Sequence, residues 1–400
     1  MEITTKDLSL LKEGKPPESK ELLLEMTLGK EKWLDIFTKY YLQNYINNGG
    51  SKVKILIGKE GTGKTHLLKF LEYTAKELGY NAIYFSAKDI SGKISDISNF
   101  YKIIADCIDQ EQLIKGLSLK VAKQMGFSIE RYDGKSKLLP LLIEEGRGQN
   151  DAGREIRKAI YNTFKKADLS PSFFTFALLV AGDRLIGLDD TDESTKIAFK
   201  WLKGEKLERF EKRDTHLFET LQKSNARYWL NALIKILNFA GIKGLVILLD
   251  DLEVLAEKKL DGRFKYTTNA VKDAYELLRQ LIDDMELLSN FLLILAGDKV
   301  LIDDDERGLK SYEALWMRLQ TGLVPLDRFN PFADMVNIDL HLKSLGEDFH
   351  EQVMKRLIKL FEVSGLKRDG TIQTPDLSKN SLLRAAVIET ALRAKKLEEE

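Results

Sequence analysis

The residues with the clearest chemical potential form the segment Gly58-Lys59-Glu60-Gly61-Thr62-Gly63-Lys64-Thr65. Glycines at these spacings permit a tight turn in which several backbone N–H groups point inward at phosphate oxygens. The ammonium of Lys64 is expected to reach the β- and γ-phosphates of ATP, and the hydroxyl of Thr65 is a suitable ligand for Mg²⁺. The segment therefore predicts a phosphate-binding loop, and we include the next residue, His66, in the candidate nucleotide site.

The residues on either side supply the elements that such a loop needs. Residues 53–57 form a mostly apolar, strand-like run, and Leu67, Leu68 and Leu71 then recur at helical spacing until Gly79. Strand, glycine loop and helix is the context of a phosphate-binding loop, and the helix N-terminus adds partial positive charge. The alternative is a glycine-rich turn with an incidental lysine.

Two carboxylates end a second apolar run. Residues 244–249 contain no alternation of apolar and polar side chains, and Asp250 and Asp251 follow directly. Such a run predicts a strand buried on both faces of a parallel sheet, whose carboxyl edge is where ligands bind. We expect Asp250 to hold Mg²⁺ through water and Asp251 to polarise the attacking water. Paired aspartates that cap the next helix are the alternative.

Further candidate residues follow in the same half of the chain. Residues 291–297 form a third apolar run, which ends at Asp298, a side chain that could help to orient water near the γ-phosphate. Arg318 lies near the end of a predicted helix, where an arginine finger could reach a neighbouring subunit's nucleotide. A surface arginine at a helix C-terminus is the alternative. Residues 335–340 alternate and predict the last strand.

These segments predict a three-layer α/β fold that is interrupted by an insertion. A helical N-terminal segment leads into a parallel-sheet core in two parts, a mostly helical insertion separates those parts, and a helical lid ends the chain. The corresponding ranges are 1–50 for the N-terminal segment, 51–110 and 240–340 for the core, 111–239 for the insertion and 341–400 for the lid.

Three other segments could contact a nucleotide or DNA. Gly29 and Lys30 lie where many ATPases present backbone to the adenine ring, although an ordinary turn is an equal alternative. Lys379 and Arg384 are candidates for a cation of the lid that senses the nucleotide. Residues 153–167 form an amphipathic helix with a basic face, which could touch DNA phosphates but is more often simply solvated.

Composition narrows the class of protein. The 400 residues are 44% hydrophobic and 31% charged with zero formal net charge, which is typical of a globular protein and gives no overall affinity for DNA. Any contact with DNA must come from a local patch. The single cysteine excludes an internal disulfide and suits the cytoplasm, and the scattered histidines suggest no zinc site. No apolar run is long enough to span a bilayer, so we expect no membrane partner.

The chain resembles the ATP-binding proteins of bacteriophage-exclusion (BREX) defence systems, a BrxD-like branch of the AAA+ and STAND-type P-loop ATPases. The resemblance covers nearly the whole chain, and four segments carry it besides the glycine loop and the strand end Asp250-Asp251-Leu252-Glu253. They are Leu11-Lys12-Glu13-Gly14-Lys15-Pro16-Pro17, Trp201-Leu202-Lys203-Gly204-Glu205, Leu278-Arg279-Gln280-Leu281-Ile282-Asp283 and Arg307-Gly308-Leu309-Lys310-Ser311-Tyr312-Glu313-Ala314-Leu315. The resemblance implies an AAA+-like core, possible binding of double-stranded DNA, and work beside a methyltransferase and other defence proteins.

Two positions depart from the family's pattern. The family usually carries Asp-Glu at the strand end, and here Asp251 replaces the glutamate with a carboxylate one methylene shorter. Glu253 could substitute as a base, but on a continuing strand it would point to the opposite side. The position of the family's sensing arginine in the lid is Asn380.

The sequence therefore favours a cytoplasmic, Mg²⁺-dependent ATPase that acts on DNA or on a defence complex, as a homo-oligomer at least transiently. A slow ATP-dependent switch or scaffold that recruits protein partners is the alternative. The two hypotheses predict different rates of ATP turnover and different effects of DNA on that rate.

Overall fold

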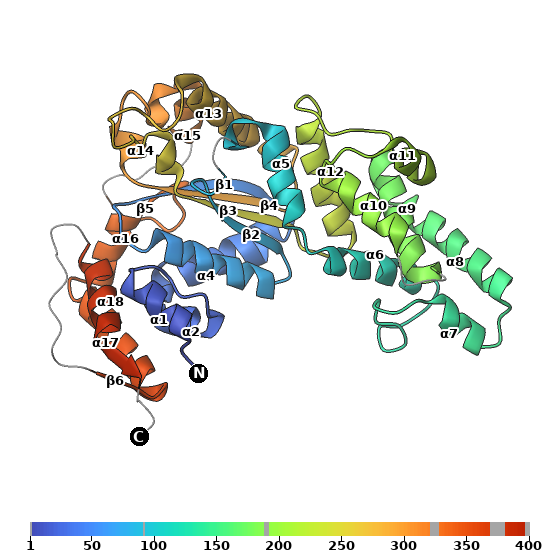
Figure 1. Ribbon diagram of the computed structural model, residues 1–400, viewed down its shortest axis with the longest axis horizontal. Helices are drawn as coiled ribbons and strands as arrows, with labels where there is room; N and C mark the ends of the chain where they lie inside the picture. The colour runs from blue at the N-terminus through green and yellow to red at the C-terminus, as the bar shows by residue number, and fades with distance from the viewer. Residues whose placement is uncertain (1, 91–92, 188–191, 321–327, 369–380, 397–400) are drawn as a thin grey trace.

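A five-stranded parallel sheet organises the protein, with the strand order β2-β3-β4-β1-β5 (Figure 1). The computed structural model describes residues 2–90, 93–187, 192–320, 328–368 and 381–396. The strands are β1 (Ser51–Ile57), β2 (Asn81–Ser86), β3 (Leu245–Asp250), β4 (Phe291–Gly297) and β5 (Met335–Asn337). All five run in one direction, so their carboxyl ends share one edge of the sheet.

The register brings the chemically interesting residues to that edge. Ile57, the residue before the glycine loop, pairs with Gly297 at the end of β4. Ser86 at the end of β2 pairs with Asp250 at the end of β3. The glycine loop, the paired aspartates and Asp298 therefore emerge side by side, although about 240 residues separate the first from the last in sequence.

The two faces of the sheet bury two separate cores. Successive residues of a strand point to opposite faces, so Ile247 and Leu249 join one core while Val246 and Leu248 join the other. The second core is closed by α4 (Lys64–Glu77), α3 (Leu34–Phe37) and the π-helix Thr38–Ile46. The first is closed by α5 (Ile97–Asp106), α12 (Ala226–Phe239) and α13 (Thr268–Asp283). The fully apolar strands are thus explained by helices on both sides, in three layers.

The segment between β2 and β3 extends away from the sheet as helices (Figure 1). Its described residues from 111 to 239 form no strand. Its apolar side chains continue the first core without a break. Besides α5 and α12, its α-helices are α6 (Gln110–Gln124), α7 (Leu139–Glu144), α8 (Gln149–Phe164), α9 (Pro171–Ile186), α10 (Glu193–Leu202) and α11 (Arg209–Thr215).

Four aromatic side chains join helices α9, α10 and α12 of this segment to α5, which packs on the sheet. The rings of Trp201 and Trp229 lie 4.5 Å apart, and Phe173 and Tyr101 pack edge-on against Trp229 at 5.8 and 5.7 Å. Both indole N–H groups donate to Glu219, one to its backbone carbonyl and the other to its carboxylate. The cluster explains why tryptophan is suitable at these positions, since each ring is buried while its polar N–H group is satisfied.

We expect the change Trp229→Ala to destabilise the protein by about 3–5 kcal/mol, because it removes a fully buried ring and leaves a cavity. Urea unfolding followed by circular dichroism would measure this loss. The matched control is Tyr228→Ala on the same helix, since that side chain is half exposed. Equal effects of the two changes would show that the aromatic cluster does not stabilise the fold.

The ends of the chain pack together rather than separately. Helices α1 (Thr5–Lys12) and α2 (Lys20–Met26) share a small core with α17 (Phe349–Val363) and α18 (Leu382–Leu392), as Figure 1 shows at the lower left. Leu11, Leu22 and Leu357 are completely buried in it. The predicted N-terminal segment is therefore divided, because its first part packs with the C-terminal helices while residues from Trp33 onward pack on the sheet.

Two elements differ from the sequence prediction. The strand expected over 335–340 ends at Asn337, whose side chain accepts hydrogen bonds from Asp339 N and Leu340 N and so begins α16 (Ile338–Leu345). Short antiparallel strands β6 (Leu366–Arg368) and β7 (Ala394–Lys396) pair in the otherwise helical C-terminal region. The remaining helices are α14 (Val300–Asp303) and α15 (Glu313–Gln320). None of the described helices has the length and apolar character needed to span a membrane.

Candidate nucleotide-binding site

The glycine loop connects β1 to α4 at the carboxyl edge of the sheet. Gly61 and Gly63 have φ angles of 76° and 89°, a left-handed conformation that residues with a side chain rarely adopt. The ammonium of Lys64 lies across the loop and donates to the carbonyls of Gly58 and Lys59, at 2.8 and 2.9 Å. The helix begins at Lys64, so its N-terminal N–H groups face the concave side of the loop.

Asp250 and Thr65 lie near each other between β3 and α4. The carboxylate of Asp250 is only 2% exposed. It accepts from the Tyr84 hydroxyl at 3.1 Å and from the backbone N–H of Asp251 at 2.9 Å. Burial raises the pKa of Asp250, and the nearby Thr65 hydroxyl opposes this increase.

The Thr65 hydroxyl and the Asp250 carboxylate are suitable ligands for a magnesium ion that is bound together with a nucleotide. No group of three or more histidine, cysteine, aspartate or glutamate side chains with metal-binding geometry occurs among the described residues. Mg²⁺ at ATP sites does not need such a group, since it takes one or two protein oxygens and completes its shell with water and phosphate. Asp250 is a buried carboxylate without a cationic partner among the described ion pairs, and it touches a hydroxyl. Thr65 and Asp250 are therefore the residues that could hold the ion.

Asp251 is fixed by two polar side chains from the neighbouring strand. It has a left-handed φ of 56°, which ends β3 and turns the chain away from the sheet. Its carboxylate accepts from the Ser86 hydroxyl at 2.5 Å and from the Lys88 ammonium at 2.7 Å. Burial alone would raise the pKa of Asp251, but the hydrogen bonds from Lys88 and Ser86 outweigh it and hold the pKa below its usual value.

Glu253 lies on the same side as Asp251, so the expectation that it points to the opposite side is wrong; residues two positions apart share a side even on a strand. The strand ends at Asp250, and a 3₁₀ helix over Leu252–Leu255 replaces it, so the alternation of sides no longer applies. Lys88 bridges both carboxylates, with 3.0 Å to Glu253. The second oxygen of Glu253 accepts from the backbone N–H of Asp298 at 3.2 Å, and burial raises the pKa of Glu253.

Asp298 contacts Glu253 and the turn that follows β4. Its backbone N–H binds Glu253, while its own carboxylate accepts from the backbone N–H of Val300 at 3.3 Å and so begins the next turn. The structure thus brings Asp298 to the site, but chiefly as a support for Glu253.

Sequence reasoning missed Lys88 and Ser86. Ser86 ends β2 and Lys88 follows it, and only the register with β3 places them beside Asp251, because β2 carries no motif. A signal was available, since polar residues at the end of any strand of a parallel sheet reach its carboxyl edge.

We expect Lys88→Met to lower kcat for ATP hydrolysis by about tenfold with little change in KM. Without the ammonium the two carboxylates repel each other and leave their positions, and a displacement of this kind costs rate rather than binding. Steady-state kinetics would measure both constants, with Lys88→Arg as the control that keeps the charge. An increase in kcat would instead identify the Lys88 bridge as a brake.

The C-terminal helices touch the outer side of the glycine loop. The Ser381 hydroxyl donates to the carbonyl of Gly61 at 2.6 Å, and Arg384 pairs with Glu60. Arg384 also donates to the carbonyl of Glu13 at 3.3 Å, so that the N-terminal segment meets the loop at the same point. The predicted candidates Lys379 and Asn380 lie outside the described residues. Of the predicted lid cations, Arg384 is therefore the one placed at the loop.

The remaining predicted residues lie around this site or elsewhere. His66 is half-buried, its ring contacts the Thr27 hydroxyl at 2.8 Å, and desolvation lowers its pKa to about 4. Lys30 lies over the Phe70 ring on α4, so this turn does approach the start of the site. The neighbouring Gly29 has a left-handed φ of 69°.

Arg318 is held within its own subunit. Its guanidinium pairs with Asp283 at 2.7 Å and donates to the carbonyl of Ala314 at 3.0 Å. Arg279 pairs with the same aspartate. Action of Arg318 on a neighbouring subunit therefore requires these contacts to be exchanged, and it stays a prediction.

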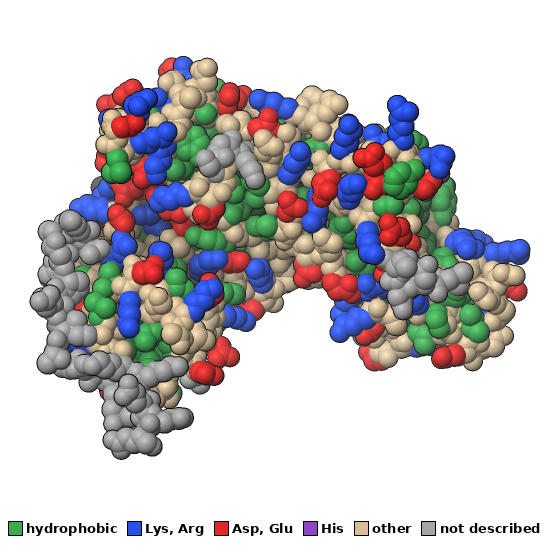
Figure 2. Space-filling model, viewed as in Figure 1, with side chains coloured by type: hydrophobic (Ala, Val, Ile, Leu, Met, Phe, Trp, Pro, Cys, Tyr) green, Lys and Arg blue, Asp and Glu red, His purple; other side chains and the backbone are tan. Residues whose placement is uncertain are grey.

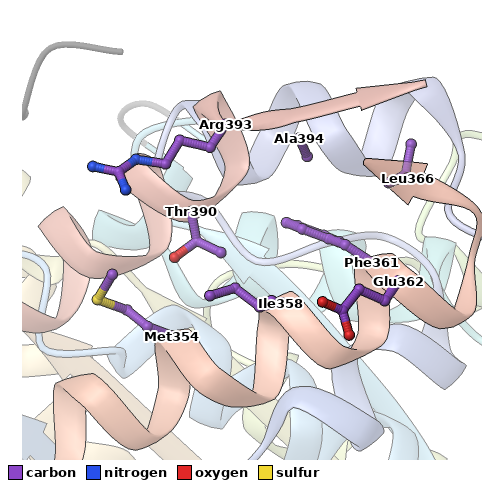
Figure 3. Close-up of a pocket in the computed structure, with 8 residues that line it drawn as sticks. All are labelled: Met354, Ile358, Phe361, Glu362, Leu366, Thr390, Arg393 and Ala394. Atoms are coloured by element: carbon purple, nitrogen blue, oxygen red, sulfur yellow. The ribbon is translucent and has the colours of Figure 1, made fainter. Parts of the chain in front are cut away.

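One pocket lies away from the sheet edge, between α17, α18 and the strands β6 and β7 (Figure 3). It is lined by Met354, Ile358, Phe361, Glu362, Leu366, Thr390, Arg393 and Ala394. None of these residues comes from the glycine loop or a strand of the parallel sheet. We assign this pocket to the packing of the C-terminal helices.

A parallel α/β sheet with a glycine loop and a buried aspartate at its carboxyl edge defines a protein of the nucleotide-binding class. The family model described as BREX system ATP-binding protein BrxC/D matches residues 11–387. The chain therefore belongs to this family of ATP-binding defence proteins. Comparisons with curated proteins and with solved structures returned no match.

Proposed function

We propose that this protein is a Mg²⁺-dependent ATPase of a BREX-type defence system. One observation supports the proposal most strongly. Asp250 is a nearly inaccessible carboxylate that lies close enough to Thr65 of the glycine loop for that hydroxyl to lower its pKa, although 185 positions separate the two residues in the sequence. A hydroxyl and a carboxylate close together beside a phosphate-binding loop are the pair that holds Mg²⁺ in P-loop NTPases.

Each residue of the site has a role in this reaction. Backbone N–H groups of residues 58–65 bind the phosphates, and Lys64 exchanges its two loop carbonyls for β- and γ-phosphate oxygens. Thr65 and Asp250 hold the metal, which neutralises charge on the phosphates when it is bound. A water molecule attacks the γ-phosphorus in line, its proton passes to a carboxylate, and the bond to the ADP oxygen breaks.

Two carboxylates compete for the role of base. Asp251 directly follows the residue that holds the metal, and its position matches the usual base of such sites. Glu253 shares Lys88 with Asp251, and its raised pKa makes it the better proton acceptor near neutral pH. We assign the role of base to Asp251, because it directly follows the residue that holds the metal, and a supporting role to Glu253.

A slow ATP-dependent switch is the second candidate. The Lys88 ammonium donates hydrogen bonds to the carboxylates of both Asp251 and Glu253. Arg384 joins the C-terminal helices directly to the glycine loop. Binding of ATP would therefore move the C-terminal helices before any hydrolysis occurs. In this case protein partners, rather than DNA, would recognise the ATP-bound conformation.

Measurement of steady-state ATP hydrolysis with and without duplex DNA, at low and at physiological salt, distinguishes the ATPase from the slow switch. Low salt is included because contacts with DNA phosphates weaken steeply as salt rises. Stimulation by DNA would support an enzyme that acts on DNA. Tight binding of ATP with slow, DNA-independent turnover would support the switch, with a methyltransferase or another defence protein as the partner.

A further inference from the structure

An exposed hairpin follows the candidate catalytic carboxylates directly. Residues 257–265 leave the 3₁₀ helix that contains Glu253 and return to the base of α13. Backbone hydrogen bonds close the hairpin from Lys259 N to Arg263 O at 2.7 Å and from Lys265 N to Glu257 O at 2.9 Å. Gly262, with a φ of 80°, completes the tight turn at its tip. We call these residues the 257–265 hairpin.

The base of the hairpin is anchored in the protein. The ring of Phe264 is covered on one side by the guanidinium of Arg307 at 4.2 Å and approached by the Lys258 ammonium at 4.8 Å. Arg307 is 8% exposed and also donates to Thr268 at 3.1 Å, at the start of α13. The tip is therefore presented by a fixed base, and this gives a structural role to Arg307.

The tip combines positive charge with one exposed apolar side chain. Leu260 is fully exposed, and Lys258 and Lys259 beside it are also exposed. The two acidic residues of the hairpin are neutralised within it, since Asp261 pairs with Arg263 and Glu257 pairs with Lys265. Lys258 and Lys259 form no ion pair with any residue that the structure describes. Their charge is thus available to a partner.

From these observations we infer that the 257–265 hairpin binds duplex DNA, with Leu260 entering the minor groove and the two lysines contacting phosphates. The inference rests on the DNA partner named in the proposed function. Leucine is among the side chains that proteins insert between base steps in the minor groove, and lysines provide the phosphate contacts that position them. On the face seen in Figure 2, basic and acidic side chains are interspersed, so a contact with DNA depends on such a local feature.

Two other partners fit the hairpin less well. Protein interfaces are enriched in exposed aromatic side chains and depleted of lysine, whereas the aromatic ring of this hairpin is covered and its tip is lysine-rich. Single-stranded DNA is bound mainly by stacking on aromatic rings, and the tip offers none.

A short stretch of chain links the hairpin to the candidate catalytic carboxylates. The backbone N–H of Ala256 donates to the carbonyl of Glu253 at 2.9 Å, and Glu257 N follows with a bond to Val254 O at 3.4 Å. Only residues 254–256 separate the hairpin from Glu253, whose carboxylate shares the Lys88 ammonium with Asp251. DNA at the tip would therefore act on the positions of the two carboxylates through one short turn.

Fluorescence anisotropy of a labelled short duplex with the full-length protein tests the inference, without nucleotide and over a range of salt concentrations. The double variant Lys258→Glu/Lys259→Glu is expected to weaken binding at least about tenfold at low salt and to reduce the salt slope by about two. Leu260→Ser is expected to weaken binding several-fold with the salt slope unchanged, because an apolar contact releases no counterions. The matched control, Arg157→Glu/Lys158→Glu on the exposed face of α8, is expected to bind as the wild type does.

Each contrary result overturns the inference. These results are wild-type affinity in both hairpin variants, a loss confined to the α8 control, tighter binding of single strands than of the duplex, and no binding of the duplex by the wild-type protein. Hairpin variants that keep DNA binding but no longer bind a protein of the defence system would assign the hairpin to a protein partner instead. Binding of a fluorescent ATP analogue is measured separately, so that failure of the hairpin inference is distinguished from failure of the ATPase proposal.

Discussion

Replacing Lys64 by alanine is expected to lower ATP hydrolysis by at least about 100-fold and to weaken binding of ATP. The ammonium lies across the glycine loop, where it contacts the carbonyls of Gly58 and Lys59. Removal of one such preorganised donor typically costs about 10²–10³ in rate. Phosphate release and titration with a fluorescent ATP analogue would measure the two effects.

Lys59→Ala is the matched control for this change. It removes the same type of side chain from the same loop, but the Lys59 side chain is exposed and its role in the loop is through its backbone carbonyl. We expect a change of less than about threefold, as for a surface substitution away from the bound phosphates. Equal losses in the two variants would mean that the loop responds to general positive charge rather than to a placed ammonium.

Asp251→Asn is expected to lower kcat by roughly 100-fold or more while ATP still binds. The amide cannot accept the proton of the attacking water, and a positioned general base contributes about 10²–10⁴ in rate. Glu253→Gln is the companion variant, because both carboxylates share Lys88. We expect it to cost about tenfold, since its amide loses the ion pair with Lys88 but leaves Asp251 in place.

Single-turnover kinetics with ATP already bound would separate these chemical effects from binding. A larger loss of rate in Glu253→Gln than in Asp251→Asn would assign the role of base to Glu253. It would also explain how the protein works with an aspartate after Asp250. Wild-type rates in both variants would exclude the two carboxylates from the chemistry.

Sequence alone predicted the parallel α/β layers and the strands on which the site depends. The unbroken apolar runs of β3 and β4 have one physical explanation, burial on both faces, and the structure gives them that environment. Glycine spacing likewise fixed the position of the loop between β1 and α4, since only glycine adopts the φ angles of Gly61 and Gly63 easily. Family membership was also predicted correctly.

Contacts between distant segments were not predictable in this way. The turn at Asp251 depends on a left-handed backbone angle at a residue that is not glycine, and the 3₁₀ helix that follows holds Glu253 within reach of Lys88. Lys88 reaches the site only through the register of β2 and β3. The packing of α1 and α2 with the C-terminal helices joins opposite ends of the chain, and no local pattern encodes such a pairing.

The most direct test of the account is phosphate release from ATP by the purified protein, measured with Mg²⁺ and with excess EDTA. The account predicts release that saturates with ATP, stops when the metal is removed and is lost in Asp250→Ala, because Thr65 and Asp250 are the residues assigned to the ion. Absence of ATP binding in the presence of Mg²⁺, or release that is equal in wild type and Asp250→Ala, would contradict it.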